Sequence, residues 1–516
     1  MSAPKVHHEI EQKLDVPARF RMPDFSGVNG LASVVTQPTV RHTAYYFDTA
    51  DLRLARSGIT LRRRLGGTDA GWHLKLPVES SDSRDDLARD ELQLPPDGKT
   101  TPPAALTGLV LAVTRGAPIA EVAKIRTARG SLAVLDSDGA PLCEVTDDRV
   151  AVLQKGHVSL RFREFEVEAA TKRSASEFAE VVAALIAAGA TPSTFTSKAR
   201  RALGAAAAAP ADVARPGRVR PSDPAADAVR AHFARNVAGF VSQDIRLRRG
   251  LPDAVHQMRV AARRLRSGLR VFDELIDIEW SQQVDAELAW IVHELGIARD
   301  VEVLQARLVA GLAETKSERS DKAAAMAVIR AEYGAATNGS LTKLLMTVES
   351  PRYLALLDLL VVAANQPRLT EAANEPCATA LPPLLRSTWK KLARDASNLQ
   401  RSGSDEPWHE TRLRAKRARY ATDALAPVFG KDALRFAKSL EQVTDLLGRH
   451  QDAAIAAQAA RELALRDGAS GQAAFALGML HTLQREEVAD VRREFLKLWP
   501  EVSKPRLRRW MQADRD

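Results

Sequence analysis

The sequence has few cysteines and no long apolar run. Its two cysteines, Cys143 and Cys377, are too few and too far apart for a disulfide framework or a zinc site. The first residues, MSAPKVHHEIEQ, contain no apolar signal-peptide core, and the most apolar run, residues 353–364, is interrupted by Asp358 and is too short to span a bilayer. We therefore expect a cytoplasmic protein with no membrane segment.

Aromatic residues are also scarce, at 5% of the chain, and the strongly basic segments contain almost none. The formal net charge of +9 and the pI of about 9.6 favour a polyanionic partner, which could be nucleic acid, an acidic membrane surface or a phosphate chain. Proteins that bind single-stranded nucleic acid stack the bases on aromatic side chains. The scarcity of aromatics therefore makes nucleic acid the weaker alternative.

The chain of 516 residues is too long for one hydrophobic core, and its pattern changes along its length. Up to about Val167, short alternating segments are separated by turn-rich pieces such as GGTDAG and DSDG, which predicts antiparallel strands and hairpins. An Ala- and Pro-rich stretch follows, and the remainder has helical periodicity. We predict a multidomain α+β protein with an antiparallel β domain at 1–204, a linker at 205–222 and an all-α domain at 223–510.

The predicted helical domain contains an internal repeat. VHQMRVAARRLRSGLRVF at 255–272 aligns with WHETRLRAKRARYATDAL at 408–425, and LGIARD at 295–300 aligns with LGRHQD at 447–452. Because both elements repeat in register, we predict a duplicated helical bundle with pseudo-twofold symmetry.

Charged residues share faces of the predicted strands, because side chains two apart on a strand point the same way. The carboxylates of Glu164, Glu166 and Glu168 form one such row, and similar rows hold the glutamates of HEIEQK and the arginines of LRRR. If the apolar faces pack outward, these rows meet in a hydrated cavity where carboxylates suit Mg²⁺ or Mn²⁺ and Arg and Lys suit phosphate. The alternative is a solvent-exposed sheet face with cross-strand ion pairs, which adjacent glutamates without an intervening cation disfavour.

Six motifs occur in an order that resembles the CYTH, or triphosphate tunnel metalloenzyme, family over about residues 4–204. They are E-x-E-x-K at 9–13, YYFDT at 45–49, LRRR at 61–64, WHLKL at 72–76, RDE at 89–91 and REFEVE at 163–168, with TSKARRAL following at 196–203.

This resemblance implies an eight-stranded antiparallel β-barrel or tunnel with flanking helices. The implied catalytic residues are Glu9, Glu11 and Lys13. The implied substrate-binding residues are Arg62, Arg64, Lys75, Arg89, Arg126 and Lys198. The implied ligands of Mg²⁺ or Mn²⁺ are Glu9, Glu11, Asp148, Glu164, Glu166 and Glu168.

Basic stripes mark both copies of the helical repeat. In the first copy, residues spaced three and four apart place His256, Arg259, Arg263, Arg266 and Arg270 on one helical face. The aligned stripe of the second copy contains His409, Arg412, Lys416 and Arg419. A single charged stripe is usually a solvated face, but two in register favour a binding function.

The helical half resembles a CHAD domain, a module that is associated with polyphosphate, through H-x-x-R-V-x-x-R-R-L-R at 256–266, its second copy at 409–419 and the two LG motifs. The resemblance implies polyphosphate binding by both stripes together with Arg264 and Arg417. We expect Asp300 and Asp452 each to orient an arginine of its own repeat.

Together these features predict a CYTH-CHAD inorganic triphosphatase that also binds polyphosphate and associates with polyphosphate granules. Three alternatives remain open. They are a non-catalytic polyphosphate-binding or granule-targeting protein, an adenylyl cyclase or thiamine triphosphatase, and an RNA-binding protein.

Overall fold

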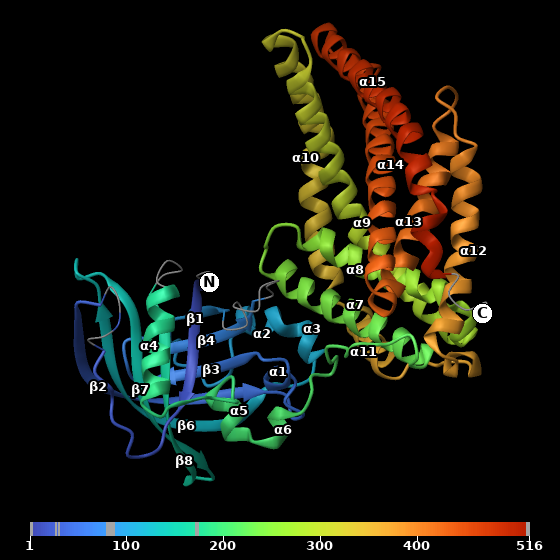
Figure 1. Cartoon of the computed structure of the whole chain (residues 1–516). Helices are drawn as coiled ribbons and strands as arrows, with labels where there is room; N and C mark the ends of the chain where they lie inside the picture. Colours follow the sequence, from blue (N-terminus) through green and yellow to red (C-terminus); the bar gives the residue numbers. More distant parts are fainter. Residues whose placement is uncertain (1–3, 26–27, 29–30, 79–87, 171–174, 512–516) are drawn as a thin grey trace. The chain divides into compact units, whose positions relative to one another are not determined.

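The computed structural model describes residues 4–25, 28, 31–78, 88–170 and 175–511. The chain forms two compact units, Met1–Asp212 and Val213–Asp516 (Figure 1). We call them the tunnel unit and the helical unit and describe each by itself.

The tunnel unit is a closed antiparallel barrel, as predicted. Its sheet order is β5-β4-β3-β2-β6-β7-β8-β1, and β1 also pairs with β5, which completes a ring of eight strands. A two-residue strand, β9 (Thr191–Pro192), adds to β1. The eight strands of the ring are β1 (Lys5–Asp15), β2 (Ser33–Asp48), β3 (Thr60–Leu65), β4 (Gly71–Pro77), β5 (Ala88–Leu94), β6 (Ala120–Leu135), β7 (Pro141–Gln154) and β8 (His157–Ala169).

Two apolar clusters lie on opposite sides of the barrel wall, because alternate side chains of each strand point inward and outward. Outside, Val145, Phe165 and Val167 pack beneath α4 (Ala175–Ala187). Inside, apolar side chains of β2, β6 and β7 pack against the buried Ala199 of α5 (Lys198–Leu203). This inner cluster fills part of the barrel interior, and the charged cavity occupies the rest.

The tunnel unit also contains several short helices, one of which lies in the predicted linker. Ala207 of α6 (Ala205–Ala208) is buried, and the carboxylate of Asp212 pairs with Arg56 at 2.7 Å and Arg115 at 2.5 Å. The first part of the segment predicted as a linker therefore packs with the tunnel unit. The other short helices of this unit are α1 (Arg53–Arg56), α2 (Ala104–Thr107), η2 (Gly108–Val110) and α3 (Leu111–Thr114).

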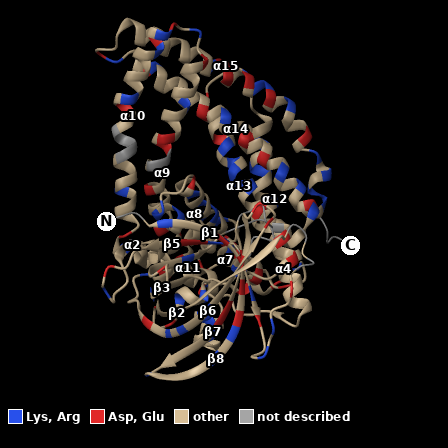
Figure 2. Ribbon diagram, turned by 90° about the vertical axis from the view of Figure 1, so that its left-hand side faces the viewer, with Lys and Arg blue, Asp and Glu red and all other residues tan. Residues whose placement is uncertain are grey.

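The described part of the helical unit consists of helices and connecting segments, as predicted (Figure 1). The two basic stripes lie on α8 and α13, and the two LG motifs lie on α9 and α14, so α7–α10 and α12–α15 are the two copies, with α11 between them. Figure 2 shows Lys and Arg residues in blue along α13. The helices are α7 (Ala225–Arg248), α8 (Ala254–Val271), α9 (Ile278–Glu314), α10 (Arg319–Thr347), α11 (Pro351–Asn365), α12 (Cys377–Ser397), α13 (Glu406–Phe429), α14 (Lys431–Ala464) and α15 (Gly471–Val502), with the 3-10 turns η4 (Asp273–Leu275), η5 (Glu371–Asn374) and η6 (Pro505–Met511).

Among the helices that the structure describes, none combines the length and the apolar character needed to cross a lipid bilayer.

Candidate functional site

The barrel interior holds a cavity of about 430 Å³ whose wall carries charges of both signs. Among the residues that the structure describes, seven carboxylates and seven Lys or Arg side chains line it. The carboxylates are Glu9, Glu11, Asp69, Glu91, Glu144, Glu166 and Glu168, and the cations are Lys13, Arg62, Arg64, Lys75, Arg89, Arg129 and Lys198. The structure thus brings together most of the residues that the sequence predicted for this site.

Arg126 is placed elsewhere, which corrects its predicted role as a substrate ligand. Its side chain is exposed and does not line the cavity, whereas Arg129 does. The two arginines are an odd number of residues apart on β6, so they point to opposite sides of the wall. Arg129 is the interior arginine of this strand.

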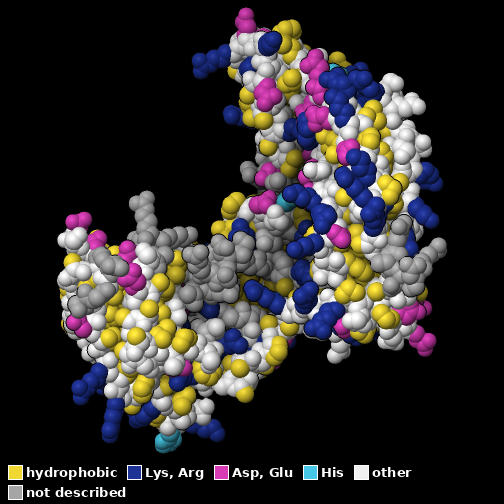
Figure 3. All heavy atoms as spheres, in the orientation of Figure 1, with side chains coloured by type: hydrophobic (Ala, Val, Ile, Leu, Met, Phe, Trp, Pro, Cys, Tyr) yellow, Lys and Arg dark blue, Asp and Glu magenta, His cyan; other side chains and the backbone are white. Residues whose placement is uncertain are grey.

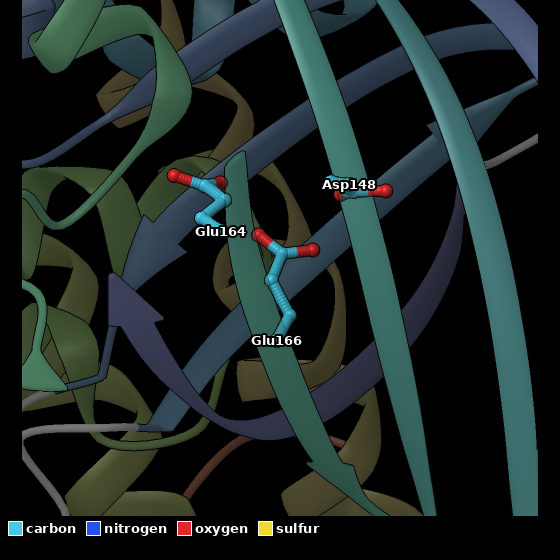
Figure 4. Close-up of side chains that lie close together, drawn as sticks. All are labelled: Asp148, Glu164 and Glu166. Carbon is cyan, nitrogen blue, oxygen red and sulfur yellow. The ribbon is translucent and has the colours of Figure 1, made fainter. Parts of the chain in front are cut away.

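Asp148, Glu164 and Glu166 lie with carboxylate oxygens within 4.8 Å of one another on β7 and β8 (Figure 4). The ammonium of Lys198 contacts all three carboxylates, at 2.8, 2.8 and 2.7 Å respectively. Arg129 donates to Asp148 and Glu166, each at 2.6 Å. Burial opposes ionisation of Glu166, but Lys13, Lys198 and Arg129 outweigh it and hold its pKa well below the usual value. This cluster is therefore already neutralised by the chain's own cations.

A second acidic row has fewer cations around it. Glu11, Glu168 and Glu144 lie directly opposite one another on β1, β8 and β7. Glu11 contacts Lys13 at 3.2 Å, but no ion pair joins Glu144 or Glu168 within the described part of the chain. Burial, then the charges of Glu11, Glu166 and Glu144, raise the pKa of Glu168. Directly opposed like charges are destabilising unless a cation joins them, so this row has the stronger need for a divalent ion.

The row includes Glu144, which sequence reasoning missed. Glu144, Thr146 and Asp148 alternate along β7, so their side chains share the inner face. The sequence already contains this signal, because Glu144 lies four residues before the predicted Asp148 and therefore on the same strand face.

Glu9 and Glu91 form the centre of a third network. Lys75 contacts Glu9 at 2.5 Å, and Glu91 contacts Arg62 at 3.1 Å and His73 at 2.9 Å. Burial, together with a hydrogen bond to Glu91, raises the pKa of Glu9 to about 8. Glu9 therefore keeps a proton more readily than an exposed glutamate does.

A cationic part of the cavity lies around Arg62, Arg64, Arg129 and His42. Burial, then the charges of Arg62 and Arg129, lower the pKa of Arg64 to about 9. Burial, then Arg64 and Arg129, lower the pKa of His42 to about 3 and keep it neutral. The lowered pKa of Arg64 shows that this guanidinium has less counter-charge than its neighbours, because Glu91 pairs with Arg62, and Asp148 and Glu166 pair with Arg129.

The carboxylate of Asp69 supplies part of that counter-charge. Asp69 lies in the β3–β4 turn and pairs with Arg64, and its side chain is 39% exposed. The Nε2 of His73 donates to the backbone oxygen of Asp69 at 2.8 Å. Gly66 and Gly71 have φ values of +84° and +149°, and a Cβ on Gly71 would meet the Leu94 oxygen at 2.4 Å, so this turn requires glycine.

The helical unit contains a second cavity, of about 410 Å³, between α8 and α13. The described residues that line it include eight cations and no carboxylate. The cations are Arg259, Arg263, Arg266, Arg270, Lys391, Arg414, Lys416 and Arg417. Both copies of the repeat contribute, so the two basic stripes meet in one shared cavity.

Five residues predicted to bind polyphosphate do not line this cavity: His256, Arg264, His409, Arg412 and Arg419. Arg419 instead pairs with Glu441 at 2.5 Å and Asp445 at 3.4 Å on α14. The Nδ1 of His409 contacts Gln451 at 2.8 Å, and Arg412 lies near the cavity but is half-buried beside Asp452.

The two copies differ in charge at aligned positions, a difference that is visible in the sequence itself. Asp423 of the second copy aligns with Arg270 of the first, so the second stripe ends in an acid. The cavity uses Arg414 of α13 and Lys391 of α12 instead, two residues that sequence reasoning missed.

The expected pairing of each LG-motif aspartate with an arginine of its own repeat differs between the copies. Arg259 contacts Asp300 at 2.5 Å, as expected for the first copy. In the second copy, Asp452 lies close enough to Arg412 for its negative charge to favour the protonated form of the guanidinium.

Lys416 is the side chain most affected by this concentration of like charge. Burial, then Arg263 and Arg412, lower its pKa to about 7. An anion in the cavity would therefore stabilise the charged amine.

The fold and the two cavities define a tunnel protein with a separate basic helical module. The CYTH domain matches residues 7–188, and the CHAD domain matches residues 231–461. The chain belongs to the family of proteins in which a CYTH domain is followed by a CHAD domain.

Its relatives include the uncharacterized proteins MT2285 and Rv2226 of two strains of Mycobacterium tuberculosis. Each is 31% identical over 516 residues, and the alignment covers 96% of this chain and 96% of the relative. Among solved structures, the chain is similar to PptA from Streptomyces chartreusis, with 26% identity, a TM-score of 0.48 and coverage of 54% of this chain and 100% of PptA. It is also similar to the CHAD domain from the plant Ricinus communis, with 24% identity, a TM-score of 0.43 and coverage of 58% and 96%.

The family supports a triphosphate-tunnel function in general terms, since CYTH tunnel proteins include metal-dependent triphosphatases and cyclases. Together, the two domains indicate ligands of the triphosphate or polyphosphate type.

Proposed function

We propose that the tunnel unit hydrolyses a terminal phosphoanhydride bond of inorganic triphosphate, or of closely related short chains, with Mg²⁺ or Mn²⁺. The observation that carries this proposal is that seven carboxylates and seven Lys or Arg side chains of the described residues line the wall of one cavity. Carboxylates collect hard divalent cations, and basic side chains collect phosphate oxygens. A cavity that does both suits a metal-assisted phosphoanhydride reaction.

The cationic part of this cavity is the proposed position of the phosphate chain. Arg62, Arg64 and Arg129 provide planar guanidiniums that can each contact two phosphate oxygens. Their positive charge stabilises the charge that develops on the transferred phosphoryl group. Tyr46 is the only Phe, Tyr or Trp among the described residues that line the cavity, so no broad aromatic wall favours a nucleotide base.

The residues present fit a divalent cation, because every donor in the acidic row is a carboxylate oxygen. Glu11, Glu168 and Glu144 would hold it, with Glu9 close by. A divalent ion at this row supplies charge neutralisation for phosphate and activates water for attack. Asp148, Glu164 and Glu166 form the alternative group, but Lys198 already contacts all three.

Glu9 is the proposed proton acceptor. Its pKa of about 8 suits a group that takes a proton from water and returns it near neutral pH. Lys75 contacts Glu9 and orients it, and Lys13 contacts both Glu11 and Glu166, which fixes the two acidic groups relative to each other.

We also propose that the helical unit binds polyphosphate in the shared cavity, and that this binding associates a cytoplasmic protein with polyphosphate granules. Eight cations without a lining carboxylate favour a polyanion, and Figure 3 shows Lys and Arg side chains gathered on the helical unit. Both copies build the cavity, so the expected stoichiometry is one site per helical unit. Affinity should fall steeply with salt, as it does for other phosphate-backbone contacts.

Phosphate release from inorganic triphosphate by the full chain, with and without Mg²⁺ or Mn²⁺, tests the tunnel proposal. We expect metal-dependent release that falls about 100-fold in Glu11→Gln, the scale seen when one preorganised catalytic group is removed. Glu144→Gln should raise the metal concentration needed for half-maximal rate, whereas Glu121→Gln, an exposed glutamate of β6, should not.

Other outcomes point to the alternative functions. Cyclic nucleotide and pyrophosphate from ATP would identify a cyclase, and preferred hydrolysis of thiamine triphosphate would change the substrate. Polyphosphate binding without any metal-dependent hydrolysis would leave a binding protein.

A further inference from the structure

Four arginines on neighbouring strands point outward from the barrel wall. All four are exposed, none lines the interior cavity, and none has an ion pair within the described part of the chain. They are Arg41 on β2, Arg126 on β6, Arg149 on β7 and Arg161 on β8. Figure 3 shows Lys and Arg side chains projecting from the lower part of the tunnel unit, where Figure 1 places β6 and β8.

The strand register arranges these arginines in two adjacent rows. Each row has an alanine between its two arginines. The first row runs Arg41, Ala128, Arg149, and the second runs Arg126, Ala151, Arg161. Neighbouring strands are about 4.8 Å apart, and side chains two residues apart on one strand are about 6.8 Å apart. The four guanidiniums therefore follow a zigzag across four strands, which we call the arginine zigzag.

No ordinary structural role accounts for the arginine zigzag. Like charges on adjacent strands are mildly destabilising, and Arg149 also lies directly opposite Arg163. A carboxylate near these rows, Asp147, is held by Arg163 through two hydrogen bonds of 2.8 Å. The four exposed arginines consequently keep their charge available for a partner.

We propose that the arginine zigzag binds an extended polyphosphate chain on the outer wall of the tunnel unit. The side chains are all arginine, whose planar fork contacts two phosphate oxygens at once. The alanines between them leave space for a chain to lie against the sheet. A phosphate chain fits better than RNA, because the two rows contain no aromatic side chain on which a base could stack.

This site is separate from both cavities and does not depend on the proposed hydrolysis. It also gives Arg126 a role on the face where the structure places it. Phosphate-chain binding outside the barrel would hold a long substrate close to the tunnel unit while the interior accepts a short one.

The test uses the full chain with the helical cavity disabled by Arg263→Glu and Lys416→Glu. Fluorescently labelled polyphosphate is titrated at low salt before and after the further change of Arg126→Gln and Arg161→Gln. We expect the residual affinity to fall about tenfold and the slope of log affinity against log salt to decrease by about 2, one unit for each arginine that no longer binds a phosphate. Thermal unfolding checks that the variants remain folded.

The matched control is Arg19→Gln with Arg21→Gln, which removes the same charge from exposed positions outside the two rows. An equal loss of affinity in this control would show a general charge effect and overturn the proposal. The proposal would also be overturned if the chain with the disabled helical cavity bound no polyphosphate before Arg126 and Arg161 are changed. Displacement of polyphosphate by RNA of equal charge would also overturn it and identify a nucleic-acid surface.

Discussion

Arg126 and Arg129 lie three residues apart on β6, yet they serve opposite sides of the barrel wall. Arg129 donates to Asp148 and Glu166 inside the cavity, whereas Arg126 is exposed outside it. The odd spacing along a strand causes this separation.

This relationship provides a matched pair of variants. Arg129→Gln should lower kcat/KM for inorganic triphosphate about 100-fold, because a charge-stabilising donor leaves the cavity. Arg126→Gln should leave kcat/KM unchanged. Steady-state phosphate release measures both, and equal decreases would contradict the assignment of Arg129 to the interior.

Asp69 competes with substrate for Arg64, so its removal should improve binding. In Asp69→Asn we expect the KM for triphosphate to fall about fivefold with little change in kcat, the effect of removing a partly exposed ion pair worth about 1 kcal/mol. Asp138→Asn, in the exposed β6–β7 turn, is the control. A higher KM in Asp69→Asn would show instead that Asp69 holds Arg64 in its binding position.

The two LG motifs offer a second matched pair. A Cβ on Gly296 would lie 3.3 Å from the Nη2 of Arg259, whereas a Cβ on Gly448 would meet nothing within 4 Å. Both positions are helical, so alanine should stabilise each helix by up to about 1 kcal/mol. Calorimetry should show polyphosphate affinity reduced about threefold in Gly296→Ala, a shift of about 0.6 kcal/mol, and unchanged in Gly448→Ala. Equal polyphosphate affinities of Gly296→Ala and Gly448→Ala would show that Arg259 does not contribute to binding.

Polyphosphate binding should take up a proton at Lys416. Burial and neighbouring arginines lower its pKa to about 7 in the free protein, and a bound polyanion raises that pKa again. The binding contribution of the charged amine is therefore fully present below pH 7 and is lost as pH rises through the pKa of the complex.

Calorimetry at pH 6 and pH 8.5, in buffers with different ionisation enthalpies, measures both the affinity and the proton uptake. Lys416→Arg remains charged throughout this range and should bind with a flatter pH dependence. A pH dependence that persists unchanged in Lys416→Arg would assign it to another group.

Strand alternation predicted the inner carboxylates, but it could not show for every strand which of its two faces points into the barrel. Glu164, Glu166 and Glu168 share one face, and the structure places that face inside. On β6, Arg126 and Arg129 both fit the sequence pattern, and only the barrel shows which parity points inward. The contacts of Lys198 on α5 with three carboxylates could not be predicted from the sequence either, because they depend on tertiary packing.

In the helical unit, the duplication and its pseudo-symmetry were visible in the aligned motifs, and the structure confirms the helical fold. Of the predicted second stripe, Lys416 is the member that lines the cavity among the described residues. The two copies are not fully symmetric, because Asp423 stands at the position aligned with Arg270. The cavity therefore draws on Arg414 and Arg417, which lie farther around the same helix.

The helical cavity is built from both copies of the repeat, and this has an evolutionary consequence. A chain with a single copy would present only half of the cationic wall, so two such chains would have to associate about a twofold axis to complete it. Fusion makes that encounter intramolecular, and assembly of the wall no longer depends on protein concentration. Within one chain the two halves can differ in sequence, as Asp423 at the position aligned with Arg270 illustrates.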